Sequence, residues 1–126
     1  MIFGVGTDVL EIRRVEALYQ RFGSRFAQRV LMPDELRLFN LSKRPVRFLA
    51  MHFAAKEAVV KALGTGFANG LWVRDTGIIA DSLGKPEIIF SDRGKAVCQR
   101  LGVGKGYLSL SDEAGLIVAM AVLERA

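Results

Sequence analysis

The sequence predicts an α+β fold, because helical and strand-like patterns occupy different parts of the chain. Between Val15 and Gly64, most apolar residues recur every three or four positions, which is typical of amphipathic helices. Beyond Leu71, short apolar runs alternate with turn residues, which is typical of strands. We therefore expect helices mostly in the first half of the chain, one of them long, and strands mostly in the second half. A chain of 126 residues has room for one domain, residues 1-126, and not for a second.

The opening segment, Ile2–Ile12, has apolar residues at both odd and even positions. A strand covered on both faces has this pattern, so we expect this strand in the middle of the sheet. Three short helical segments follow, each with a glycine, serine or proline at one end. They are Val15–Phe22, which ends at Gly23; a short stretch that Ser24 caps, through Phe26 and Val30; and a helix that Pro33-Asp34-Glu35 opens and that runs to about Asn40.

The longest helical pattern runs from Arg44 to Leu63, and Gly64 ends it. One face of this helix carries Ala54, Ala58 and Ala62, spaced four residues apart. Because alanine side chains are small, we expect a neighbouring element to approach closely along this face.

The second half of the chain contains the remaining strands and one further helix. The predicted strands are Leu71–Ala80, Pro86–Phe90, Gly106–Ser111 and Leu116–Leu123. A turn at Asp81–Lys85 joins the first two, and Ser91 caps a helix, Asp92–Leu101, that Gly102 closes. The last strand is apolar on both faces, so we expect it inside the sheet or at a contact between subunits.

The charge of the chain restricts the kinds of partner that it binds. The chain has 18 Lys and Arg against 13 Asp and Glu, a formal net charge of +5. The excess favours nucleic acid, a phosphorylated small molecule or an acidic protein. No zinc-finger, basic-zipper or RNP-like motif favours nucleic acid among these. The chain has one cysteine, Cys98, so it cannot form an internal disulfide. It shows no basic leader and no apolar run long enough for a bilayer. These features predict a reduced, cytoplasmic protein.

Two acidic residues are unusual in their surroundings. Asp8 interrupts an otherwise apolar strand, where an unpaired charge is costly, so it needs a cation, a set of hydrogen bonds or the wet end of the sheet. Glu57 lies in the middle of the longest helix, among apolar neighbours. Its spacing to Lys61 also allows an ordinary surface ion pair, so the residues alone leave both interpretations open.

Two glycine-containing turns are weaker signals. Gly64-Thr65-Gly66 ends the long helix, and such a turn can bring backbone N–H groups close to an anion. Gly84-Lys85-Pro86 is by itself a tight turn that enters a strand.

Taken together, these segments resemble the holo-[acyl-carrier-protein] synthase family, the short bacterial type of 4'-phosphopantetheinyl transferase. The resemblance rests on Gly6-Thr7-Asp8, on the block from Phe53 to Gly66 and on Gly84-Lys85-Pro86, and it extends from Met1 to Arg125. It implies the α+β fold of the 4'-phosphopantetheinyl transferases, a mostly antiparallel sheet packed on one long helix and several short ones. It also implies Mg²⁺-dependent transfer of 4'-phosphopantetheine from coenzyme A to a serine of apo-acyl carrier protein, with release of 3',5'-ADP, in fatty acid biosynthesis.

The resemblance assigns roles to the two acids and the nearby lysine. Asp8 and Glu57 are expected to hold Mg²⁺, which prefers oxygen ligands and typically takes one or two protein carboxylates. Lys61 is expected to bind the phosphates of coenzyme A and to take part in catalysis. Glu57 and a metal-bound water both remain candidates for the general base that receives the serine proton.

The resemblance also predicts contacts with both substrates. For coenzyme A they are Lys61, Gly64, Thr65, Gly66, Arg44, Arg47 and His52, with His52 standing where many members carry arginine. For the carrier protein they are Arg14, Leu18, Arg21, Phe22 and Arg25. Members of this length are typically homotrimers with the active site between neighbouring subunits, and no contact with nucleic acid or membrane is expected.

Three other functions remain to be distinguished. A basic nucleic-acid-binding module would bind DNA or RNA in a salt-dependent manner and would need no magnesium. Another metal-dependent phosphate-ester enzyme would use the same two acids. A catalytically silent structural trimer would not need Asp8, Glu57 and Lys61.

Overall fold

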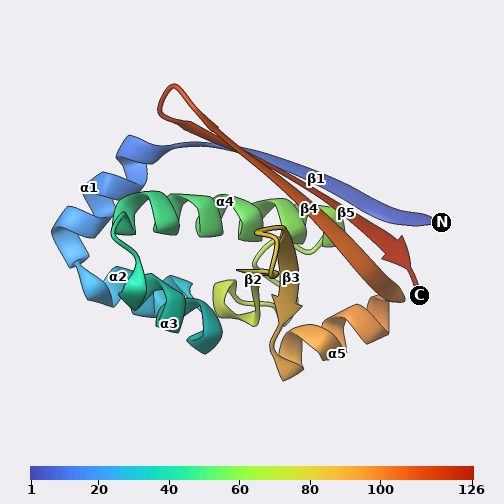
Figure 1. Ribbon diagram of the computed structural model, residues 1–126. Coiled ribbons are helices and arrows are strands. Elements are labelled where there is room, and N and C mark those ends of the chain that lie inside the picture. Colours follow the sequence, from blue (N-terminus) through green and yellow to red (C-terminus); the bar gives the residue numbers. More distant parts are fainter.

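A computed structural model describes residues 1–126 as a sheet lying across one long helix (Figure 1). The sheet is antiparallel and contains β1 (Ile2–Glu11), β4 (Val103–Glu113) and β5 (Leu116–Arg125), in the order β1-β5-β4. Helix α4 (Pro45–Leu63) packs on its inner face. The predicted α+β fold, with a mostly antiparallel sheet on one long helix, is confirmed. No helix of this chain is both long and apolar enough to cross a bilayer.

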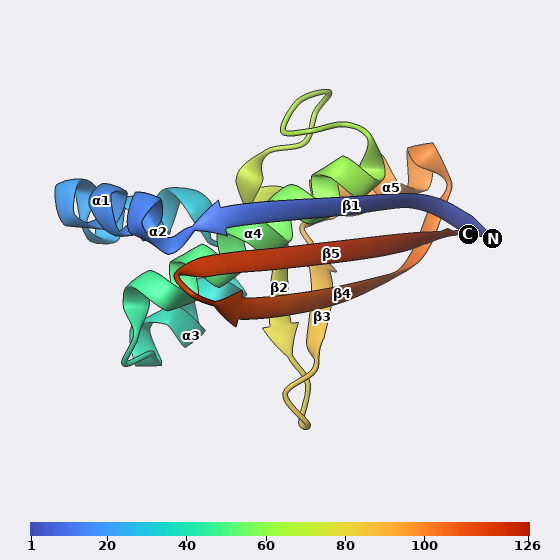
Figure 2. The same cartoon turned by 90° about the horizontal axis from the view of Figure 1, so that it is seen from above.

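The other elements surround α4. Three short helices lie at the end of α4 where it begins: α1 (Ile12–Phe22), α2 (Ser24–Val30) and α3 (Pro33–Leu41). A separate hairpin of β2 (Thr76–Ala80) and β3 (Pro86–Phe90) crosses beneath the sheet, and its tip projects from the molecule (Figure 2). Helix α5 (Asp92–Leu101) lies near the chain termini, and a 3₁₀ turn, η1 (Val73–Asp75), precedes the hairpin.

The prediction that the first strand lies in the middle of the sheet is wrong. Strand β1 is at an edge, and β5 lies between β1 and β4. The prediction failed because apolar residues on the outer face of β1 resemble those of a covered strand, although no element of this chain packs on that face. Val5 and Val9 of β1 are 50% and 63% exposed, and Val118 and Met120 of β5 are 41% and 44% exposed.

Several local predictions need correction at the ends of elements. Leu71–Asp75 is not part of a strand, because Val73–Asp75 forms the turn η1 and β2 begins only at Thr76. Ser24 is the first residue of α2 rather than its cap, and Gly23, with φ of 57°, holds the cap position. Ser91 caps α5 as predicted, with its hydroxyl accepting a hydrogen bond from the Gly94 N–H at 3.0 Å.

Close packing of β1 on α4 fixes the position of the strand's inner side chains. Gly4 and Gly6 lie directly against the alanine face of α4, as the alanine spacing predicted. A Cβ at Gly6 would lie 2.0 Å from the Ala58 carbonyl oxygen and 2.6 Å from the Ala62 nitrogen. Alternate residues of a strand point to the same face, so Asp8, two residues after Gly6, also points toward α4.

Candidate active site

Asp8 of β1 meets α4 near the end of the helix. Its side chain is 15% exposed, and its Oδ1 lies 3.2 Å from Nζ of Lys61. The same ammonium donates a hydrogen bond to the Thr7 carbonyl oxygen at 2.9 Å. Lys61 therefore joins the helix to β1, and the surface ion pair between Lys61 and Glu57 that the spacing allowed is not formed.

Glu57 lies one turn before Lys61 and faces the same site. Partial burial and the negative charge of Asp8 raise the pKa of Glu57, and the Lys61 ammonium only partly opposes them. Two carboxylates thus repel one another with one lysine to balance them. An all-oxygen pair with surplus negative charge is a donor set that suits a hard divalent cation, so Asp8 and Glu57 are the residues that could hold one.

We expect Gly6→Ala to separate these groups. The added Cβ would collide with the Ala58 carbonyl, so β1 must move away from α4 and carry Asp8 with it. Overpacking of this kind costs about 1–3 kcal/mol, measurable by urea denaturation. Thr7→Ala is the matched control, because Thr7 is exposed on the outer face. Equal stability of the two variants would contradict this account of the packing.

The Gly64-Thr65-Gly66 turn follows directly from the last turn of α4. Gly64 is left-handed, with φ of 80°, and its N–H donates to the carbonyl oxygens of Val60 and Lys61. The Gly66 N–H also donates to Val60, at 3.3 Å. Two of the three backbone N–H groups are therefore used within the helix end, and the Thr65 N–H has no acceptor within the chain.

The residues predicted for the nucleotide lie elsewhere on α4. Arg44 is the exposed N-cap of the helix, and Arg47 donates from Nε to Oδ2 of Asp112 on β4. Arg47 and His52 line a hollow of about 440 Å³ together with Gly84 and Pro86. Neither Glu57 nor Lys61 lines this hollow, and Arg47 precedes Lys61 by about 21 Å along the helix at the usual rise per residue.

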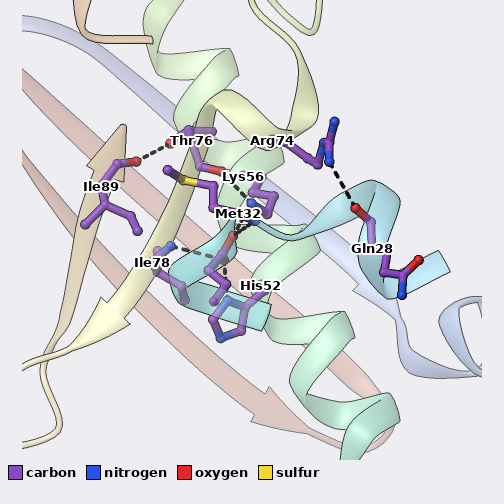
Figure 3. A network of polar contacts seen from close by, with 9 residues as sticks. Gln28, Met32, His52, Lys56, Arg74, Thr76, Ile78 and Ile89 are labelled. Atoms are coloured by element: carbon purple, nitrogen blue, oxygen red, sulfur yellow. Dashed lines mark hydrogen bonds and ion pairs between the residues drawn. The ribbon is translucent and has the colours of Figure 1, made fainter. Parts of the chain in front are cut away.

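His52 takes part in a buried polar network that the sequence did not reveal (Figure 3). Its Nδ1 contacts Oε2 of Glu35, and Nζ of Lys56 donates to Oε1 of Glu35 at 2.5 Å. The backbone N–H groups of Met32 and Ile78 donate to the same carboxylate. Glu35 and Lys56 are both 0% exposed, so Glu35 is a structural centre rather than the ordinary first-turn acid that its sequence position predicts.

The residues predicted to dock the carrier protein share one surface. Leu18, Phe22 and Arg25 line a hollow of about 230 Å³ between α1 and α2, which we call the α1–α2 groove. The guanidinium of Arg21 lies 5.1 Å from the centre of the Phe22 ring. Arg14 is exposed one helical turn before Leu18, on the same side of α1.

The fold and the site define a class: α+β proteins with two facing carboxylates and a lysine where the first strand meets the long helix. A profile of the 4'-phosphopantetheinyl transferase superfamily matches residues 4–121. The holo-[acyl-carrier-protein] synthase of Hamiltonella defensa is 47% identical over 123 residues, which are 98% of each chain.

Solved structures agree with these sequence matches. The crystal structure of holo-[acyl-carrier-protein] synthase from Neisseria meningitidis is 41% identical, covers 99% of this chain and 100% of its own, and superposes with a TM-score of 0.94. The Bacillus anthracis synthase, solved in complex with coenzyme A (3',5'-ADP), is 33% identical. It covers 100% of this chain and 99% of its own and gives a TM-score of 0.82. The chain belongs to the 4'-phosphopantetheinyl transferase superfamily and, within it, to the holo-[acyl-carrier-protein] synthases.

Proposed function

We propose that this enzyme transfers 4'-phosphopantetheine from coenzyme A to a serine hydroxyl of apo-acyl carrier protein. The observation that carries the proposal is the meeting of Asp8, Glu57 and Lys61 where β1 crosses α4. In this reaction the serine oxygen bonds to the β-phosphorus of coenzyme A, and the bond from that phosphorus to the bridging oxygen breaks. The leaving group is 3',5'-ADP, and the serine proton passes to a base.

The side chains suit the charge changes of this reaction. Lys61 lies at the site and provides a positive charge for the pyrophosphate oxygens, after exchanging its contact with Asp8. Glu57 faces the same site as Asp8, so Glu57 and a water held at the metal site are the two candidates for the base that receives the serine proton. The Thr65 N–H can donate to a phosphate oxygen at the end of α4.

The donor set of Asp8 and Glu57 fits Mg²⁺, which we propose as the cofactor. When bound, Mg²⁺ would neutralise pyrophosphate charge and draw electron density from the leaving phosphate. The fit rests on two oxygen donors whose mutual repulsion, evident in the raised pKa of Glu57, a cation would relieve.

We further propose that the active enzyme is a homotrimer, formed in the cytoplasm by single domains of residues 1-126. The exposed apolar outer face of β1 and β5 is the surface that such an assembly would bury. An active site between subunits would also explain why Arg44, Arg47 and His52 lie far from Lys61 within one chain. A coenzyme A molecule could then contact Lys61, Gly64, Thr65 and Gly66 of one subunit and the nucleotide residues of the next.

The direct test is incubation of the protein with apo-acyl carrier protein, coenzyme A and Mg²⁺. The carrier protein should gain the mass of phosphopantetheine, and 3',5'-ADP should appear in equal amount. The absence of both products with folded enzyme would reject the proposed function.

Arg14→Glu is expected to raise KM for the carrier protein by about tenfold, because it reverses a charge on the surface that meets an acidic partner. The KM for coenzyme A should stay unchanged, since Arg14 forms no hydrogen bond or ion pair with Asp8, Glu57 or Lys61. Arg37→Glu on α3 is the matched control, because Arg37 is exposed and pairs only with the neighbouring Asp34. An effect confined to KM for coenzyme A would contradict the assignment of the α1–α2 groove.

A further inference from the structure

A second basic hollow, of about 440 Å³, lies beside Trp72 where η1 meets α2 and α5. We call it the Trp72 hollow. Arg29, Arg74 and Arg93 line it, and Asp75 is the only acid among its lining residues. Asp75 contributes little negative charge to the surface, because its side chain is 6% exposed and accepts hydrogen bonds from Ser91, Arg93 and the Trp72 N–H. The hollow therefore presents positive charge and aromatic surface to the solvent.

The side chains of the Trp72 hollow are held in place but remain available to a partner. Arg93 donates from Nε to Asp75 at 2.9 Å, and its guanidinium lies 4.9 Å from the centre of the Trp72 ring. This is the only hydrogen bond that the Arg93 side chain makes, so its terminal nitrogens are free. Arg74 makes one long contact, 3.5 Å from Nη1 to the Gln28 carbonyl oxygen (Figure 3). Trp72, the only tryptophan of the chain, is 62% exposed.

The Trp72 hollow is continuous with the α1–α2 groove. An apolar hollow lined by Phe26, Phe53 and Phe67 lies between them; it shares Phe26 and Arg29 with the groove and Arg29 and Trp72 with the Trp72 hollow. Phe53 lies one helical turn before Glu57 on the same side of α4. One surface thus extends from α1, past the catalytic side of α4, to Trp72.

We propose that the Trp72 hollow is a second docking site for the acyl carrier protein, which binds an acidic segment separate from the one at the α1–α2 groove. The proposal rests on the proposed function, which supplies the acidic partner. The argument is charge complementarity along a continuous surface, with an exposed tryptophan and arginines, the residue types that dominate binding energy at protein interfaces. The stretch between the two basic regions is apolar, which favours a folded protein as the partner. The phosphates of a nucleic-acid backbone would lie against this apolar stretch with no basic side chain other than Arg29 to neutralise them.

Arg74→Glu tests the proposal, because Arg29 also lines the α1–α2 groove and Arg93 pairs with Asp75, whereas Arg74 lines the Trp72 hollow and makes one long contact. We expect KM for apo-acyl carrier protein to rise about three- to tenfold at low salt, and the difference to shrink as salt is added. The kcat and the KM for coenzyme A should be unchanged. Lys95→Glu is the matched control, since Lys95 is exposed on α5 and lines a different hollow. Equal KM values for the two variants would overturn the proposal, whereas a wild-type enzyme without transfer would reject the function itself.

A second measurement does not depend on turnover. Because Trp72 is the only tryptophan, its fluorescence reports on this hollow when a tryptophan-free apo-acyl carrier protein is titrated into the wild-type enzyme. We expect a saturable change that Arg74→Glu weakens. No change, with binding confirmed by calorimetry, would overturn the proposal. A change caused by coenzyme A alone would identify a nucleotide site instead, and a response to single-stranded DNA but not to carrier protein would identify a nucleic-acid site.

Discussion

Glu35→Gln is expected to lower the free energy of unfolding by about 3–5 kcal/mol, because it leaves the buried Lys56 ammonium without its counter-charge. Glutamine keeps the shape of the side chain, but an NH₂ group replaces one of the two carboxylate oxygens. Each of those oxygens has two partners in the native network. The NH₂ group would then face donors from Lys56 and Met32 or from His52 and Ile78. Urea denaturation at neutral pH measures the loss.

Asp34→Asn is the matched control for this change. Asp34 is the preceding residue in the same helical turn, and its ion pair with Arg37 is exposed, so its loss should cost less than about 1 kcal/mol. A double replacement, Glu35→Gln with Lys56→Met, removes both charges and keeps an amide oxygen as an acceptor, so it should recover part of the stability lost in Glu35→Gln. If Glu35→Gln were no more costly than Asp34→Asn, the network would not be the structural centre that we describe.

The stability that depends on Glu35 also has a definite pH dependence. Burial alone would raise the pKa of Glu35, but the His52 hydrogen bond and the Lys56 charge together hold the pKa below its ordinary value of 4.5. Burial lowers the pKa of Lys56, and the charge of Glu35 only partly opposes this effect. The ionised form is therefore favoured by the native environment for Glu35 but not for Lys56. The Glu35 contribution is therefore present above pH 4.5 and is lost as the pH falls through the lower native pKa. The difference between wild type and Glu35→Gln should shrink over that range.

The parts of the fold that could be predicted from sequence depend on local patterns. The alanine spacing of α4 predicted the close approach that Gly4 and Gly6 of β1 make. Ser91 and Gly102 marked the ends of α5, because a hydroxyl cap and a left-handed glycine act within one turn. These signals need no knowledge of distant residues.

The parts that could not be predicted depend on partners far away in the chain. Lys61 contacts Asp8, 53 residues earlier, in place of the nearby Glu57. The position of Glu35 near the start of a helix predicts an ordinary first-turn acid, although its carboxylate accepts hydrogen bonds from Lys56 of α4 and Ile78 of β2. The sequence also predicts a covered outer face for β1, although Val5 and Val9 are exposed there. Apolar composition alone does not distinguish a face covered by the same chain from one that the chain leaves exposed.

Asp8→Asn and Glu57→Gln are each expected to lower kcat for phosphopantetheine transfer by about 10³-fold, the effect of losing one electrostatic contact to the reacting phosphates. Each change removes a charged oxygen donor from the proposed Mg²⁺ site, and Glu57→Gln also removes one of the two candidate bases. Glu87→Gln is the matched control, because Glu87 is an exposed strand acid without an ion pair. Single-turnover kinetics at saturating coenzyme A and carrier protein measure the chemical step.

The metal assignment can be separated from a purely structural role by thermal unfolding. Besides burial, the negative charge of Asp8 raises the pKa of Glu57. Without a divalent cation, Asp8→Asn therefore removes a repulsion on Glu57 and should not destabilise the protein by that route. Mg²⁺ binds only the folded site, so Tm of the wild type should rise with the logarithm of the Mg²⁺ concentration once the site is mostly filled, and Tm of both variants should not change. An equal rise of Tm in wild type and variants would place the metal elsewhere. Transfer that survives either substitution within about tenfold of wild type, a difference of about 1.4 kcal/mol, would show that the two carboxylates do not act on the phosphates together.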